Sequence, residues 1–212
     1  IEKPLAAALG AGLDIYEPCG SMVVDIGGGT TDSGVISLGG IVTSASLRIA
    51  GDKFDSSIID YIKREFNLMI GERTAEDIKI NIGAAFPEAR QGHMDVRGRD
   101  LLSGLPKTID VSVQQISEAL NSPVTRIVDC VKRVLEDTPP ELSADIMDRG
   151  IIMTGGGSML YGLDELIRRE TQIPTSLAED PLSCVALGTG KALDSIGVLD
   201  GKGKNLGFGR KK

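Results

Sequence analysis

Residues 23–32 of the chain read VVDIGGGTTD, an apolar run that ends in the carboxylate of Asp25 and continues through three glycines and two threonines. Glycines at the end of a strand let main-chain N–H groups approach an anion with no Cβ in the way. The segment is therefore typical of a phosphate cradle, although the same letters also suit an ordinary glycine-rich hairpin turn.

The residues beside these glycines suit the same chemistry. Mg²⁺ keeps most of its waters and is often held by one or two carboxylates, so Asp25 is a candidate to hold a hydrated Mg²⁺. Threonine hydroxyls such as that of Thr30 orient a water or bind a phosphate oxygen.

A second glycine triplet occurs in IIMTGGGSML, residues 151–160, after an apolar strand and before a helix predicted to begin near Ser158. A helix N-terminus is a site for anions, and the alternative is a tight turn that needs small residues. Neither triplet is a Walker A loop or a GxGxxG fingerprint. Two glycine-rich strand ends favour a nucleotide held from two sides, and we expect them to face one groove.

Composition narrows the function classes. The 212 residues are 41% hydrophobic and 25% charged with a formal charge of −7, which is ordinary for a globular protein and argues against a nucleic-acid partner. No apolar run reaches the roughly 18 residues that span a bilayer. Three scattered cysteines favour reduced thiols, and a single histidine makes a zinc site or a Ser-His-Asp triad hard to build. Because the chain starts at Ile1, we expect it to be part of a longer protein.

The order of elements predicts an α/β fold, with a mixed sheet flanked by helices. We expect a helix at 2–12, a three-stranded meander with a hairpin at Gly39–Gly40, a helix from Phe54, and a helix at 74–85 capped by Thr74. Short strands follow at 86–112, then a short helix, a longer helix opened by Pro123, a loop at 138–150, and a strand–helix–strand–helix end. The predicted parts are 1–70, a small inserted α+β subdomain at 71–112, 113–200, and a flexible basic tail at 201–212.

Four motifs together resemble a known superfamily. VVDIGGGTTD, IIMTGGGSMLYGL and ALGTGKAL resemble the phosphate-2, adenosine and second connecting motifs of the actin/DnaK-type chaperone/sugar-kinase ATPases, and IEKPLAAALGAG resembles the first connecting motif. Within that superfamily, DIGGGTTD, AGDKFD and TAEDIKINIG are most similar to the MreB/Mbl family of bacterial actins. The resemblance covers essentially the whole chain and implies a ribonuclease-H-like, actin-type ATPase domain, of which this is the second half, subdomains IIA and IIB.

The resemblance also implies residue roles. Asp25 would act on Mg²⁺ through water, Gly27, Gly28, Gly29 and Thr30 would bind the β- and γ-phosphates, and Gly155, Gly156, Gly157 and Ser158 would lie along the adenosine and α-phosphate. Glu76 and Lys79 match a pair near the ribose and adenine, with a solvated helix face as the alternative. Thr30 and Glu2 are the candidate catalytic residues, whereas Asp52 and Asp55 are interpreted as helix-capping acids.

The sequence departs from the family pattern in two places. The phosphate-1 hairpin, a DxG motif, is absent, so one side of the cleft is not present. Lys3 stands where the family has the glutamate that helps position the attacking water, and Glu2 is one residue away, a step of roughly 100° on a helix. ATP hydrolysis is expected of the full-length protein and is left open for this chain.

The resemblance implies an ATP- or ADP-binding cytoskeletal protein that self-associates into filaments. Such filaments lie beneath the cytoplasmic membrane, guide cell-wall synthesis and determine rod shape. The expected partners are proteins of cell-wall synthesis and membrane morphogenesis, and the inner face of the cytoplasmic membrane through the half that is not present. The expected location is cytoplasmic, membrane-associated when full-length. The alternatives are a DnaK-type chaperone ATPase, which needs a peptide-binding domain, and a sugar or acetate kinase.

Overall fold

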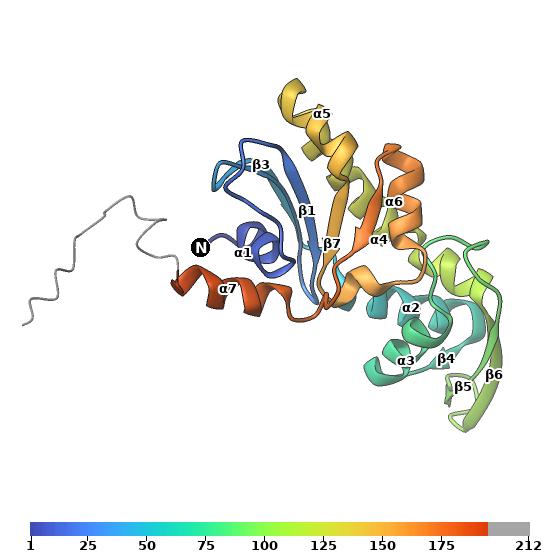
Figure 1. Ribbon diagram of the computed structural model, residues 1–212. Helices are drawn as coiled ribbons and strands as arrows, with labels where there is room; N and C mark the ends of the chain where they lie inside the picture. The colour runs from blue at the N-terminus through green and yellow to red at the C-terminus, as the bar shows by residue number, and fades with distance from the viewer. Residues whose placement is uncertain (195–212) are drawn as a thin grey trace, which may run out of the picture.

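The protein is built on a five-stranded mixed sheet (Figure 1). The computed structural model describes residues 1–194, and the predicted basic tail at 201–212 lies outside the described residues. The strand order is β3-β2-β1-β7-β8; β1 is antiparallel to β2 and parallel to β7. The strands are β1 (Ser21–Ile26), β2 (Thr31–Ser37), β3 (Gly40–Leu47), β7 (Ile151–Thr154) and β8 (Thr175–Leu177). This confirms the predicted mixed sheet.

The predicted hairpin between β2 and β3 is confirmed, one residue earlier than expected. Its two turn residues are Leu38 and Gly39, both with positive φ, at 51° and 77°. Two consecutive residues with positive φ suit the right-handed twist of a tight hairpin.

Alternation along β1 divides the core between the two faces of the sheet. Met22, Val24 and Ile26 face the main hydrophobic core, whereas Val23 belongs to a smaller cluster on the opposite face. Successive side chains of a strand point to opposite faces, so a single apolar run contributes to both clusters. The main core packs against α2 (Gly51–Phe66), α4 (Val113–Glu136) and α6 (Leu163–Thr171), and the smaller cluster packs against α1 (Lys3–Gly10) and α7 (Cys184–Asp194).

Helices α1 and α7 lie against each other on one side of the sheet (Figure 1). A Cβ at Gly10 would overlap the carbonyl oxygen of Cys184, and a Cβ at Gly188 would overlap the carbonyl oxygen of Ala6. The two backbones therefore touch at both glycines. This contact brings together the first and the last described helices, which are far apart in the sequence.

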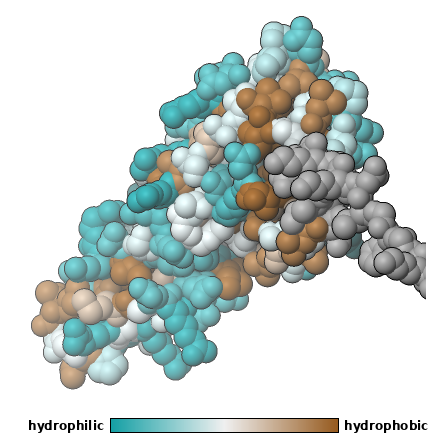
Figure 2. Space-filling model, turned by 90° about the vertical axis from the view of Figure 1, so that its left-hand side faces the viewer, coloured by the Kyte–Doolittle hydropathy of each residue, from teal (hydrophilic) through white to brown (hydrophobic). Residues whose placement is uncertain are grey.

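A smaller three-stranded sheet hangs from the end of α2. Its order is β4-β5-β6, all antiparallel, and α3 (Glu72–Ile82) packs on β5. The strands are β4 (Leu68–Met69), β5 (His93–Asp100) and β6 (Pro106–Ser112), so this sheet already includes residues ahead of 71. The turn from β5 to β6 exposes Leu102 and Leu105, and Figure 2 shows apolar surface at this lower end of the molecule.

One long helix, α4, replaces the two helices predicted on either side of Pro123. Ser112 and Gln115 form a capping box at its start, and Pro123 lies in its interior. The buried stripe runs through the proline, with Ile116 and Leu120 before it and Ile127 after it. An interior proline costs about 3 kcal/mol, whereas each buried apolar side chain stabilises by roughly 1.5–3 kcal/mol, so burial keeps the helix whole.

Three other expectations were wrong. The predicted loop at 138–150 contains α5 (Pro140–Arg149), because Pro140 occupies the first turn, where a missing N–H is harmless, and Ile146 is buried. Thr74 does not cap α3, whose N-cap is Gly71. The helix expected near Ser158 begins only at Leu163, and Gly156–Met159 forms a single 3₁₀ turn.

Two further observations concern the whole described range. Cys19, Cys130 and Cys184 are all free, as the sequence predicts. Within residues 1–194, no helix combines the length and apolar character that crossing a bilayer requires.

The buried stripe of α4 gives a stability prediction. Ile127→Ala removes a fully buried side chain and should lower the free energy of unfolding by about 2–5 kcal/mol. Arg126→Ala, the exposed neighbour, should change it by no more than about 0.5 kcal/mol. Urea unfolding followed by circular dichroism measures both, and equal effects would mean that the stripe after Pro123 does not carry the packing.

Candidate functional site

The two glycine loops share one groove. Strands β1 and β7 run parallel with Asp25 opposite Thr154, so their carboxyl ends lie at the same edge of the sheet. A groove of about 950 Å³ opens there, lined on this side by Gly27, Gly28, Gly156 and Gly157. Helices α2 and α3 line the groove with, among others, Asp52, Asp55, Glu76 and Lys79. The structure thus brings together loops that lie more than a hundred residues apart.

The start of α2 holds the first glycine loop in place. The N–H of Gly51 donates to the carbonyl of Gly27 at 3.1 Å, and the N–H of Asp52 donates to that of Gly28 at 2.9 Å. Within residues 1–194, the N–H groups of Gly28 and Gly29 have no hydrogen-bond acceptor. The loop therefore has two free donors, of which that of Gly28 belongs to the groove lining, while the carbonyls of Gly27 and Gly28 are occupied.

Nothing inside the protein requires glycine at 27, 28 or 29. None of the three has positive φ, and the nearest atom that an added Cβ would meet is Asp52 Oδ1, 3.2 Å from the position at Gly28. Glycine is the costliest residue to order, so three in succession with no internal need indicate an outside group that approaches the backbone closely.

The second loop differs, because most of its glycines are required by the fold. Gly155 has φ +82°, and a Cβ there would overlap the carbonyl oxygen of Ile26; a Cβ at Gly157 would lie 2.5 Å from Ile26 Cγ2. Ser158 is buried and its hydroxyl donates to the Gly155 carbonyl at 2.6 Å. Gly155 and Ser158 thus shape the loop from within, while Gly156 is exposed to the groove.

The wall formed by α2 and α3 is charged. Lys79 forms an ion pair with Asp55 at 2.9 Å, both mostly buried, and Glu76 lies exposed beside them. Neither Asp52 nor Asp55 caps α2, because its N-cap is Ala50 and no side chain hydrogen-bonds there. Sequence reasoning missed Arg90, whose guanidinium lies 5.0 Å from the ring centroid of Tyr161 at the groove, since its polar surroundings carry no motif.

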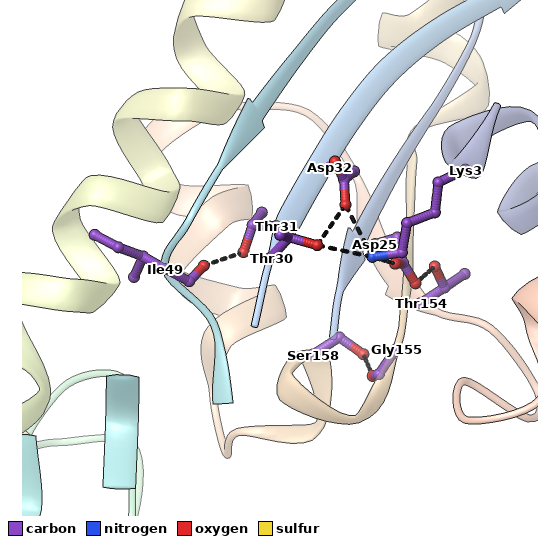
Figure 3. Close-up of polar contacts among 9 residues, drawn as sticks. All are labelled: Lys3, Asp25, Thr30, Thr31, Asp32, Ile49, Thr154, Gly155 and Ser158. Carbon is purple, nitrogen blue, oxygen red and sulfur yellow. Dashed lines mark hydrogen bonds and ion pairs between the residues drawn. The ribbon is translucent and has the colours of Figure 1, made fainter. Parts of the chain in front are cut away.

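A pair of carboxylates lies next to the first loop on the α1 side of the sheet (Figure 3). Asp25 of β1 and Asp32 of β2 are direct cross-strand partners. The Lys3 ammonium lies 2.7 Å from Asp25 Oδ2 and 2.8 Å from Asp32 Oδ2, and also donates to the Thr30 hydroxyl at 3.1 Å. The Thr154 hydroxyl donates to Asp25 Oδ1 at 2.8 Å. One ammonium therefore bridges both acids.

These contacts change the acid–base behaviour of the cluster. For Asp32, burial raises the pKa, but hydrogen bonds from Lys3, Ser46 and Thr30 outweigh it and hold the pKa below its usual value. For Lys3, burial lowers the pKa, but the bonds to Asp25 and Asp32 outweigh it and raise the pKa. Both shifts favour the charged forms, so Lys3 and Asp32 form an ion pair at neutral pH.

The two candidate catalytic residues lie in different places. Thr30 is within the cluster, where its hydroxyl also donates to Asp32 at 2.8 Å. Glu2 is exposed at the N-cap of α1, and its side chain forms no hydrogen bond with the described part of the chain. Helix α1 thus directs Lys3, and not Glu2, to the carboxylates.

Comparison with solved structures gives the class of fold. MreB5 of Spiroplasma citri bound to ADP superposes with a TM-score of 0.90 at 42% identity, over 95% of this chain and 62% of that one. A second structure of MreB5 is bound to AMPPNP. The MamK double helical filament shares the fold, with a TM-score of 0.75 at 21% identity over 91% of this chain and 58% of that one. The described domain is therefore an actin-like fold.

Sequence comparison gives the family. The family model for the MreB/Mbl protein matches residues 1–200, and the chain belongs to that family. It is 58% identical to the cell shape-determining protein Mbl of Bacillus subtilis (strain 168), over 93% of this chain and 60% of the relative. It is 53% identical to the cell shape-determining protein MreB of Escherichia coli (strain K12), over 95% of this chain and 58% of the relative. The chain thus spans less than two thirds of these relatives.

A methyl group added to a glycine should affect the free energy of unfolding differently in the two loops. Gly155→Ala forces a side chain into a backbone conformation that glycine alone adopts readily and should cost at least about 2 kcal/mol of unfolding free energy. Gly28→Ala should change it by less than about 1 kcal/mol, since φ allows a Cβ and the tightest neighbour, 3.2 Å away, is the end of the flexible Asp52 side chain. Urea unfolding of both variants checks this, and a large loss from Gly28→Ala would mean that the fold itself needs that glycine.

Proposed function

We propose that this chain forms one wall of an ATP- or ADP-binding site in an actin-like, cell shape-determining protein. The observation that carries the proposal is the groove lined by Gly28, whose N–H, like that of Gly29 next to it, has no acceptor within residues 1–194, although the fold needs no glycine at either position. A phosphate chain is the ligand that such a bare backbone suits best, because each N–H donates directly to an anionic oxygen.

The rest of the groove suits the rest of a nucleotide. The exposed Gly156 continues the bare surface away from Gly28, the α2–α3 wall adds Glu76 and Lys79, and the loop after α3 adds the Arg90 guanidinium. Carboxylates accept hydrogen bonds from ribose hydroxyls, and an arginine stacks on a flat base. The family relation and the ADP and AMPPNP bound by MreB5 support the same ligand.

We assign binding, and not hydrolysis, to this half of the site. The position at which the resemblance places a water-orienting glutamate carries Lys3, and the Lys3 ammonium is paired with Asp25 and Asp32. A general base must accept a proton, and a protonated amine has no acceptor. Thr30 remains a candidate to orient a water, although its hydroxyl is held by Lys3 and Asp32.

Beyond the nucleotide, we propose self-association into filaments that lie at the inner face of the cytoplasmic membrane and guide cell-wall synthesis, with morphogenesis proteins as partners. The names of the MreB and Mbl relatives support the role in cell shape, and the fold shared with the MamK filament is compatible with assembly. A nucleotide held between two halves couples assembly to the closed state. The match to cell shape-determining proteins, and to no chaperone among these relatives, favours this over the chaperone alternative.

Nucleotide binding is testable in the full-length protein. Gly28→Ala inserts a methyl group where the phosphates approach and should weaken binding of a fluorescent ATP analogue by about tenfold or more, the equivalent of roughly 1.4 kcal/mol. Gly190→Ala makes the same chemical change in open space on α7 and should leave the affinity unaltered. Equal affinity for both variants would remove the phosphate site from this loop.

Assembly is tested separately by sedimentation of the full-length protein. ATP should increase the pelleted fraction, and Gly28→Ala should need about tenfold more ATP for the same increase because it weakens nucleotide binding. Pelleting that ignores ATP contradicts coupled assembly. Turnover stimulated by unfolded peptide, without pelleting, would favour the chaperone alternative instead.

A further inference from the structure

The residues around Asp25 do not fit the Mg²⁺ ion that the resemblance implies. Asp25 is 1% exposed; its Oδ1 accepts from Thr154 and its Oδ2 pairs with Lys3. Asp32 Oδ2 is engaged by both Lys3 and Thr30. Mg²⁺ keeps most of its waters and is usually held by one or two carboxylates, and here the carboxylate oxygens nearest the loop are already engaged by the Lys3 ammonium. The Lys3 ammonium occupies the position beside these oxygens.

The register of β1 and β2 brings two acidic side chains together, and this favours a cation between them. Asp25 and Asp32 are direct cross-strand partners, so their side chains lie on the same face within about 5.5 Å of each other. Two like charges in that arrangement repel, and the repulsion is stronger because Asp25 is out of contact with water. A positive charge placed between the two carboxylates offsets part of this repulsion, and the Lys3 ammonium occupies that position.

Lys3 is built to supply that charge. Pro4, the second residue of α1, packs on Gly34 of β2, where an added Cβ would lie 2.9 Å from Pro4 Cβ. This contact fixes the start of α1 directly over the carboxylates. The Lys3 ammonium also lies 3.6 Å from the position that a Cβ on Gly27 would take, and 38% of its side chain is exposed. It therefore reaches from the buried acids to the open glycine loop.

We propose that the Lys3 ammonium is a tethered cation that takes the place of a divalent metal at Asp25 and Asp32, so that the groove binds its nucleotide without requiring Mg²⁺. This inference rests on the proposed nucleotide site and adds its cation requirement. Lysine is a compact point charge, suited to attract phosphate by charge while its hydrogen bonds go to the protein.

The first test measures nucleotide affinity in the full-length protein with excess Mg²⁺ and with EDTA. The wild-type affinity for a fluorescent ATP analogue should differ by less than about threefold between the two conditions. The affinity of Lys3→Met should be about tenfold or more higher with Mg²⁺ than with EDTA, a typical coupling between two ligands. Lys63→Met removes a charge about 18 Å along α2 from its start and should behave as the wild type. A tenfold or greater loss in the wild type on adding EDTA overturns the inference.

The second test needs no nucleotide. In Lys3→Met the two carboxylates lose their cation, so the melting temperature should fall, and millimolar Mg²⁺ should restore about 2–4 °C of it. The wild-type melting temperature should be the same with Mg²⁺ and with EDTA. An equal Mg²⁺ effect in the wild type, or none in folded Lys3→Met, contradicts the inference.

The two tests separate the failures. If no version binds the ATP analogue under any condition, the proposed nucleotide function is wrong, and the melting temperatures alone decide whether Lys3 replaces a metal. If Lys3→Met does not fold, the wild-type protein still decides the question, because its affinity and melting temperature must both be independent of Mg²⁺.

Discussion

The opposition of Asp25 and Asp32 across β1 and β2 is the constraint around which the site is arranged. Strand register places two carboxylates on the same face of the sheet, and burial denies Asp25 the water that would screen it. The chain answers with one ammonium from α1, carried to this point by a helix that packs on both strands. Helix α1 therefore covers one face of the sheet and also supplies the cation that pairs with its two acids.

The glycines of the two loops differ in whether the fold itself requires them. Gly155 and Gly157 are demanded by backbone conformation and by the close approach of β1, so they would be glycines in a protein with no ligand at all. Gly27, Gly28 and Gly29 meet no such demand; α2 holds the carbonyls of Gly27 and Gly28, and the N–H groups of Gly28 and Gly29 have no acceptor within residues 1–194. The functional signal lies in the glycines that the fold does not need.

Much of this was accessible from the sequence, where local signals agree with the tertiary structure. Apolar runs before each glycine triplet predicted β1 and β7, and the spacing after Phe54 predicted α2. Two predictions at prolines were wrong. Pro123 was predicted to start a helix and Pro140 to lie in a loop, because the buried apolar residues on the same helices were not taken into account. The Lys3 contact was out of reach, since it depends on where α1 packs. The difference between the two triplets needed φ angles, which the letters do not contain.

The glycine contacts between α1 and α7 have a mechanical consequence. With no side chain between the backbones at Gly10 and Gly188, neither helix has room to rotate or slide without collision against a main-chain carbonyl. We therefore expect the first and last described helices to move together. Because Lys3 lies at the start of α1, a displacement of α7 would also move the ammonium that lies between the two acids.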